Sequence, residues 1–152
     1  MRKRTRSREF ALQVLYQADL SQNTAASALE DFWEDRSDLE LSEKEKEVIE
    51  EDKKDSEIRQ YTEKLVRGTL EKIQPIDLLI EKYAEHWAIK RMAFVDRNIL
   101  RLSAYEIMYL EDIPIKVAIN EAVELAKRYG EADSSKFVNG ILDRIAKMEC
   151  NK

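Results

Sequence analysis

The sequence has few of the residues from which most catalytic and metal sites are built. Its 152 residues include one cysteine, Cys150, and one histidine, His86. A single cysteine excludes an internal disulfide and a dithiol metal site, and no CxxC or HExxH spacing marks a zinc site. One histidine far from one cysteine also argues against a Cys–His nucleophile. We therefore predict no metal, no cofactor and no catalytic residues, and we expect that the protein is not an enzyme.

Glycine, proline and long apolar runs are also scarce. The chain has three glycines and two prolines. The glycines are isolated, so they form neither a phosphate-cradling loop nor a dinucleotide-binding fingerprint. Few breakers among many strong helix formers predict an all-α protein. No apolar run approaches the roughly 20 residues of a membrane span, and the basic N-terminus lacks the apolar stretch of a signal peptide. We expect a cytoplasmic protein with no membrane partner.

Charge is abundant and unevenly distributed. Charged residues make up 38% of the chain, and the net charge is −5. Residues 1–8 nevertheless contain five cations and no acid, whereas residues 30–57 contain 14 acidic and five basic residues. Any affinity for phosphate is therefore concentrated at the N-terminal end. A basic tail that only aids solubility remains the alternative.

The spacing of apolar residues predicts about seven helices in two small packed bundles. The first helix is expected from Thr5 to Leu20, and Thr24 is expected to cap the second. Residues Arg36 to Leu41 are typical of a loop. A capping box at Ser42–Glu45 starts a helix whose charged stretch, residues 43–57, is expected to be a solvated extension. The apolar pattern of this helix strengthens from Ile58 to Ile73. Further helices are expected at residues 75–87, 95–110 and 115–129 and from Asp133 onward, with Pro75 in the first turn of the first of these.

The predicted helices form a single domain, residues 1–152, with an N-terminal lobe of about residues 1–74 and a C-terminal lobe of about residues 75–152. Gly130 is expected to end a helix with positive φ. The side chains expected in the core are those of Trp87, Ile99, Leu102, Ile119, Val123 and Ile141.

Two segments are candidates for nucleic-acid binding. The first, here called the arm, is residues 2–8, and arginine suits phosphate because its fork donates two parallel hydrogen bonds. In the second segment, residues 133–140, Asp133 or Ser134 is expected to cap a helix. Lys136 and Phe137 then lie in its first turn, where a cation and an aromatic face can hold a nucleotide. Periodicity alone places Phe137 in the core, so both interpretations stay open. The cations of the arm are Arg2, Lys3, Arg4, Arg6 and Arg8.

These segments resemble the NusB family of transcription antitermination factors. The resemblance follows almost the whole chain in order, and residues 34–56 lie outside it as a longer acidic connection. It is densest at Ile113-Pro114-Ile115-Lys116-Val117-Ala118-Ile119-Asn120-Glu121-Ala122. The other matching stretches are residues 4–9, 11–16, 95–102, 104–106, 126–130 and 136–143.

The resemblance implies an all-helical, non-catalytic fold of two small bundles. It also implies binding of boxA-type single-stranded RNA together with NusE, a small-subunit ribosomal protein. Through these partners the family joins RNA polymerase and other Nus factors and suppresses termination, notably during ribosomal RNA synthesis. Family members differ in whether they dimerise, so a homodimer remains open.

The resemblance also assigns residues. Arg4, Arg6 and Arg8 fall in the family's arginine-rich RNA-binding arm, although the family often has arginine where this chain has Thr5. Asp133, Lys136 and Phe137 fall on the family's second RNA-contacting segment. Tyr16 and Asp96 fall where the family meets NusE; the family frequently has glutamate at the second position, so the charge is kept.

Two alternative functions remain. Ribosomal RNA cytosine methyltransferases carry a similar helical block ahead of a catalytic domain; we disfavour such an accessory module because the sequence ends at Lys152 without that domain. The other alternative is a helical interaction protein that binds no RNA and whose arm holds another acidic partner.

Overall fold

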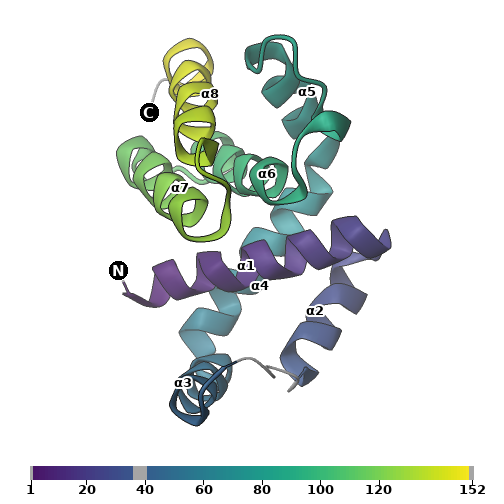
Figure 1. Ribbon diagram of the computed structural model, residues 1–152, viewed down its shortest axis with the longest axis vertical. Coiled ribbons are helices and arrows are strands. Elements are labelled where there is room, and N and C mark those ends of the chain that lie inside the picture. Colours follow the sequence, from purple (N-terminus) through teal and green to yellow (C-terminus); the bar gives the residue numbers. More distant parts are fainter. Residues whose placement is uncertain (1, 36–40, 151–152) are drawn as a thin grey trace. The chain divides into compact units, whose positions relative to one another are not determined.

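Every regular element in the described part of the chain is a helix. The computed structural model describes residues 2–35 and 41–150, so most of the predicted loop at Arg36 to Leu41 lies outside the described residues. The all-α prediction is confirmed. The helices (Figure 1) are α1 (Arg2–Ser21), α2 (Ala25–Glu34), α3 (Glu43–Lys54), α4 (Ser56–Glu71), α5 (Ile73–Tyr83), the 3₁₀-helix η1 (Ile89–Arg91), α6 (Phe94–Tyr109), α7 (Ile115–Tyr129) and α8 (Ser134–Glu149). None of these helices is long and apolar enough to cross a membrane.

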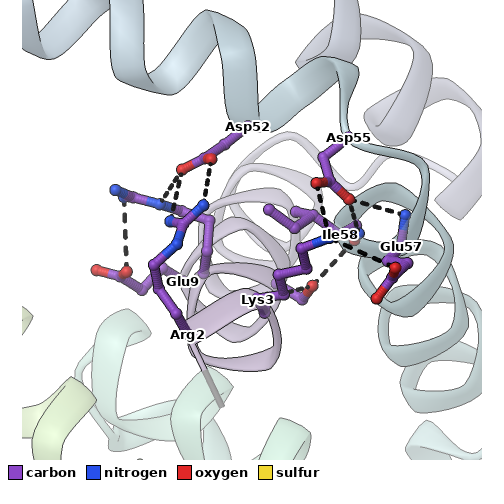
Figure 2. Close-up of polar contacts among 9 residues, drawn as sticks. Arg2, Lys3, Glu9, Asp52, Asp55, Glu57 and Ile58 are labelled. Carbon is purple, nitrogen blue, oxygen red and sulfur yellow. Dashed lines mark hydrogen bonds and ion pairs between the residues drawn. The ribbon is translucent and has the colours of Figure 1, made fainter.

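The helix starts follow the local chemistry of the sequence. The Thr24 hydroxyl accepts a hydrogen bond from the Ser27 N–H at 3.1 Å, and the Ser42 hydroxyl accepts one from the Glu45 N–H at 3.2 Å. Both predicted caps are therefore confirmed. The described ranges contain eight α-helices rather than about seven because one predicted helix is interrupted at Asp55, between α3 and α4. The Asp55 carboxylate accepts from the N–H groups of Glu57 and Ile58 and so starts a new helix, α4 (Figure 2).

The chain divides into two compact units, Met1–Arg67 and Gly68–Lys152. The boundary falls within α4, whereas the composition of the sequence had placed it near Pro75. In the first unit the rings of Phe10, Phe32 and Trp33 pack edge to face, with centroid separations of 5.0–6.2 Å. The small Ser7 side chain lets α1 approach α4, with its Oγ 3.0 Å from the carbonyl oxygen of Ile58.

In the second unit, α6 packs against α5, α7 and α8. Arg101 of α6 donates to both carboxylate oxygens of Asp77, from Nε at 2.8 Å and from Nη2 at 2.9 Å. This bidentate pair links α6 to α5. Gly68, at the start of the unit, is needed because an added Cβ would lie 2.1 Å from the Tyr105 ring. The buried apolar side chains of α6 are those of Ile99, Leu100, Leu102, Ala104 and Ile107.

The predicted core is partly wrong. Ile99, Leu102 and Ile141 are buried, but Ile119 and Val123 are only half-buried. These two lie on the flank of the α7 stripe, whereas Ala118, Ala122, Leu125 and Ala126 occupy its centre.

Trp87 is the largest departure from the predicted core, since its side chain is 50% exposed. Helix α5 ends at Tyr83, before the apolar stripe of the sequence reaches Trp87. Glu85 and His86 then adopt positive φ values of 35° and 62°. The backbone therefore turns, and Trp87 does not continue the buried face.

Gly130 ends α7 as expected, but not by positive φ, because its φ is −95°. An added Cβ would instead lie 2.6 Å from the side chain of Ser134. Glycine is required here by this close approach rather than by its backbone freedom.

Candidate nucleic-acid interface

The arm is helical from its start. Residues 2–8 form the first two turns of α1, which places cations on more than one face of the helix. Arg2, Lys3 and Arg4 are exposed, Arg6 is half-buried, and Arg8 is only 2% exposed. The arm therefore offers charge to solvent mainly through its first three cations.

Asp52, near the end of α3, holds two of the arginines of the arm. Its carboxylate accepts hydrogen bonds from Arg2 Nη2 at 2.8 Å and from Arg6 Nε at 2.8 Å (Figure 2). Arg6 also lies 3.5 Å from a carboxylate oxygen of Glu9. Although Asp52 is buried, the hydrogen bonds and charge of Arg2, aided by Arg6, hold its pKa below the usual range.

Asp55 and Glu57 pair with the remaining cation on this side. The Lys3 ammonium lies 3.2 Å from Asp55 and 3.4 Å from Glu57 (Figure 2). The N–H of Ile58 and the ammonium of Lys3 lower the pKa of Asp55. Asp55 therefore has two functions, as it both starts α4 and pairs with Lys3 of the arm. We refer to Asp52, Asp55 and Glu57 together as the acidic clamp.

Arg4 and Arg8 turn toward an aromatic ring instead. The Arg4 guanidinium lies over the Tyr61 ring at 4.6 Å from its centroid, and that of Arg8 lies at 5.8 Å. Such cation–π contacts stabilise by about 0.5–2 kcal/mol each. Arg8 is buried in this arrangement, so it contributes to the packing of the arm rather than to its exposed charge.

The expectation that residues 43–57 form only a solvated extension is wrong at its C-terminal end. Asp52 and Lys53 are buried. Lys53 donates to the carbonyl oxygen of Asp35 at 3.0 Å and lies 4.5 Å from the Phe32 ring centroid. The end of α3 is thus part of the first unit, and its Asp52 carboxylate pairs with Arg2 and Arg6 of the arm.

The second segment begins α8. Asp133 is in the expected N-cap position but makes no capping hydrogen bond through its side chain, so the prediction of a side-chain cap by Asp133 is wrong. The Ser134 hydroxyl accepts instead from the N–H of Glu131 at 2.9 Å. Lys136 is exposed, and Phe137 is half-buried with its ring edge to face against Trp87 at 6.1 Å. Phe137 is therefore neither fully in the core nor freely exposed.

The two residues assigned to a protein partner lie in different units. Tyr16 of α1 is 36% exposed, as expected of a residue at the rim of the apolar stripe. Asp96 is in the first turn of α6, but Ala93 is the N-cap residue, so Asp96 does not cap the helix. The Asp96 Oδ1 atom is buried and has no hydrogen-bond partner among the described residues.

The sequence model of the NusB family matches residues 5–147. The chain belongs to the NusB family. The transcription antitermination protein NusB of Thermodesulfovibrio yellowstonii is 45% identical over 97% of this chain and 93% of that protein. The matched residues include all of α8 except Met148 and Glu149, and all of the arm from Thr5 onward.

Solved NusB structures share the fold. NusB from T. maritima superposes with a TM-score of 0.79 at 38% identity, covering 97% of this chain and 93% of that one. A crystal structure of the antitermination factors NusB and NusE in complex with double-stranded RNA superposes with a TM-score of 0.78 at 31% identity, covering 97% and 98%. The resemblance read from the sequence is confirmed at the level of family and fold.

Two features near the candidate site were not predicted from the sequence. The acidic clamp was missed because Asp52 and Arg2 are 50 residues apart, and pairing at that separation depends on the fold. The opposite charges of residues 1–8 and 30–57 were the only signal. The contact of Trp87 with Phe137 was missed because helical periodicity placed both residues in the core. No cluster of three or more metal-ligating side chains occurs within residues 2–35 and 41–150.

Proposed function

We propose that this NusB-family chain binds boxA-type single-stranded RNA together with NusE and acts in transcription antitermination. The observation that carries the proposal is the arm, which gathers five cations on the first two turns of α1 in a chain that matches the family over residues 5–147. The curated relatives are named as transcription antitermination proteins rather than as enzymes.

The arm supplies the electrostatic part of the affinity. Phosphates of a single strand replace the carboxylates of the acidic clamp on Arg2, Lys3 and Arg6. Arg4, whose guanidinium lies over the Tyr61 ring, offers a further charge for phosphate. Each phosphate contact releases counterions, so the affinity falls as salt rises. Arg8 is buried beside Tyr61, so it stabilises this surface through packing.

The start of α8 supplies a second contact. Lys136 is exposed and offers a charge for phosphate, and the adjacent Phe137 offers a ring for an unpaired base. Asp133 repels phosphate, so it is better suited to accepting a hydrogen bond from a base. Unpaired bases are available in single-stranded RNA, which favours that form over a duplex.

NusE is the proposed protein partner, with Tyr16 and Asp96 in its interface. The solved complex of NusB with NusE supports this pairing. A chain of net charge −5 is complementary to a basic ribosomal protein. Through RNA and NusE the chain would act indirectly with RNA polymerase and other Nus factors, and its place of action would be the cytoplasm.

The alternatives are weaker. An accessory module of a methyltransferase is disfavoured because the aligned T. yellowstonii relative is itself an antitermination protein covered over 93% of its length. A helical interaction protein of the second kind would show no RNA binding in a titration, with or without NusE. A homodimer remains open, and its formation would be read from the mass in solution.

The test is an RNA titration at several salt concentrations, with and without NusE. The variant carries Arg2→Ala, Lys3→Ala and Arg4→Ala, and the control carries Lys44→Ala, Lys64→Ala and Lys116→Ala, which remove the same charge from exposed positions elsewhere. We expect the arm variant to bind boxA-type RNA more weakly and to lose about 0.7 in log–log salt slope per phosphate contact. NusE should strengthen binding by the wild type. A salt slope equal in variant and control would remove the arm from the interface, and no RNA binding with NusE present would refute the function.

A further inference from the structure

Trp87 is an exposed aromatic side chain without a role in the fold described above. It is one of two tryptophans in the chain, and half of its surface is open to solvent. It lies outside the regular helices, after α5 ends at Tyr83 and before η1 begins at Ile89. Single exposed apolar side chains are common at protein surfaces, whereas two aromatic rings in contact there form a surface that can bind a ligand.

The backbone before Trp87 is held in an uncommon conformation. Glu85 and His86 both have positive φ, which disfavours side chains other than glycine, and neither residue is glycine or asparagine. The segment after it is anchored, because the Ile89 N–H donates to the Glu81 carboxylate at 2.7 Å. The turn is therefore defined on both sides, and it presents the indole at the surface.

Trp87 and Phe137 form one aromatic surface. Their rings lie edge to face, with centroids 6.1 Å apart and planes inclined by 76°. Trp87 contributes the exposed ring and Phe137 the half-buried ring, next to the exposed Lys136. Lys90 and Arg91, which follow Trp87 in η1, add exposed cations to the same segment. Glu85 and Asp133 add negative charge, so the rings rather than bulk charge would give this surface its affinity.

We propose that Trp87 stacks on an unpaired base of the bound RNA, with Phe137 holding the indole in place and lining the same base-binding surface. This inference rests on the proposed function, and it names a residue that the sequence had placed in the core. Every base has a π-face, so stacking tolerates different sequences and adds to the phosphate contacts. The base that stacks on Trp87 belongs to single-stranded RNA, because the bases of a duplex are already stacked on one another.

Fluorescence of single-tryptophan variants tests the contact directly. Trp33→Phe leaves Trp87 as the only tryptophan, and Trp87→Phe leaves Trp33 as the matched control. Each variant is titrated with boxA-type single-stranded RNA at low salt, where affinity is highest, and saturation is checked by the anisotropy of a labelled strand. We expect strong quenching in Trp33→Phe and little change in Trp87→Phe. Unchanged Trp87 emission at saturation would overturn the proposal.

Affinity separates stacking from a structural role. We expect Trp87→Ala to weaken RNA binding by about 5- to 100-fold, with Trp87→Phe keeping most of the affinity. Because the indole is exposed, the melting temperature of Trp87→Ala should fall little. A lowered melting temperature with unchanged RNA affinity would assign Trp87 to packing alone.

An abasic scan of the RNA identifies the stacked nucleotide. Removing one base at a time leaves the phosphates intact, so only stacking and base contacts are lost. We expect one position at which base removal weakens the wild type but not Trp87→Ala. Equal sensitivity of both proteins at every position would refute stacking while leaving the proposed function intact. Failure of the wild type to bind any of these strands, even with NusE, would instead refute the proposed function.

Discussion

Ile99 is a core residue whose substitution should change the free energy of unfolding through packing alone. Its side chain is fully buried in α6, the helix that packs against α5, α7 and α8. Ile99→Ala should destabilise the protein by about 2–5 kcal/mol, because the cavity adds to the lost transfer free energy. Denaturant unfolding measures this loss. The control is Leu78→Ala, whose side chain is 70% exposed and whose removal should cost much less. Similar losses for both variants would contradict the described core.

Asp96 carries one of two buried side-chain atoms, the other being Thr69 Oγ1, for which the described residues supply no hydrogen-bond partner. Its Oδ1 is buried without a hydrogen bond among residues 2–35 and 41–150, which is costly unless another molecule supplies a donor. The positive end of α6 favours its charge but does not replace that donor. Asp96→Lys should therefore weaken NusE binding by about tenfold or more.

Calorimetric titration of NusE measures the effect of Asp96→Lys, with RNA binding in the absence of NusE as the internal control. That second affinity should stay near the wild-type value. Glu111→Lys, an equal charge reversal at an exposed position, controls for net charge. Wild-type affinity for NusE combined with a lower melting temperature would remove Asp96 from the interface.

At the scale of elements, the end of α3 acts on α1 through one carboxylate. Asp52 holds Arg2 and Arg6 at 2.8 Å each, so it competes with phosphate for these cations. Asp52→Asn should therefore raise RNA affinity by about two- to fivefold, the range expected for breaking a partly exposed ion pair. Glu47→Gln removes the same charge from an exposed position of α3 and controls for net charge. A lower RNA affinity in Asp52→Asn would mean that Asp52 orients the arm for RNA rather than competing with it.

The same variant has a defined pH signature. The pKa values of Asp52 and Asp55 are lowered in the folded protein. Their contribution to stability is thus present above the unfolded carboxyl pKa of about 4 and is lost as pH falls through the folded values. Asp52→Asn should be less stable than the wild type at neutral pH, and the two should converge in acid. Melting curves across this pH range measure the convergence.

At the scale of the whole molecule, a net charge of −5 coexists with a cationic arm because the opposite charges occupy different segments. The acidic clamp pairs with Arg2, Lys3 and Arg6, which lowers the positive charge that the arm presents to nucleic acid. The two proposed RNA segments belong to different compact units, the arm to Met1–Arg67 and the start of α8 to Gly68–Lys152.

The amino-acid sequence alone was sufficient for most of the helices, for the caps at Thr24 and Ser42, and for the family. Thr24 and Ser42 act through neighbours three residues away, and such contacts depend only on local backbone geometry. Periodicity also identified Ile99, Leu102 and Ile141 as core residues, because a strong apolar stripe must be buried wherever the helix packs.

Only the tertiary structure decided which side chains meet. The sequence contained the cations of the arm and the carboxylates of α3, but the pairing of Arg2 with Asp52 spans 50 residues and depends on how α1 and α3 pack. Trp87 was wrongly placed in the core because periodicity cannot reveal that α5 stops at Tyr83 and that Glu85 and His86 turn the chain. Hydrogen bonds within a helix are local, whereas a charge clamp and an aromatic pair require distant segments to be brought together by folding.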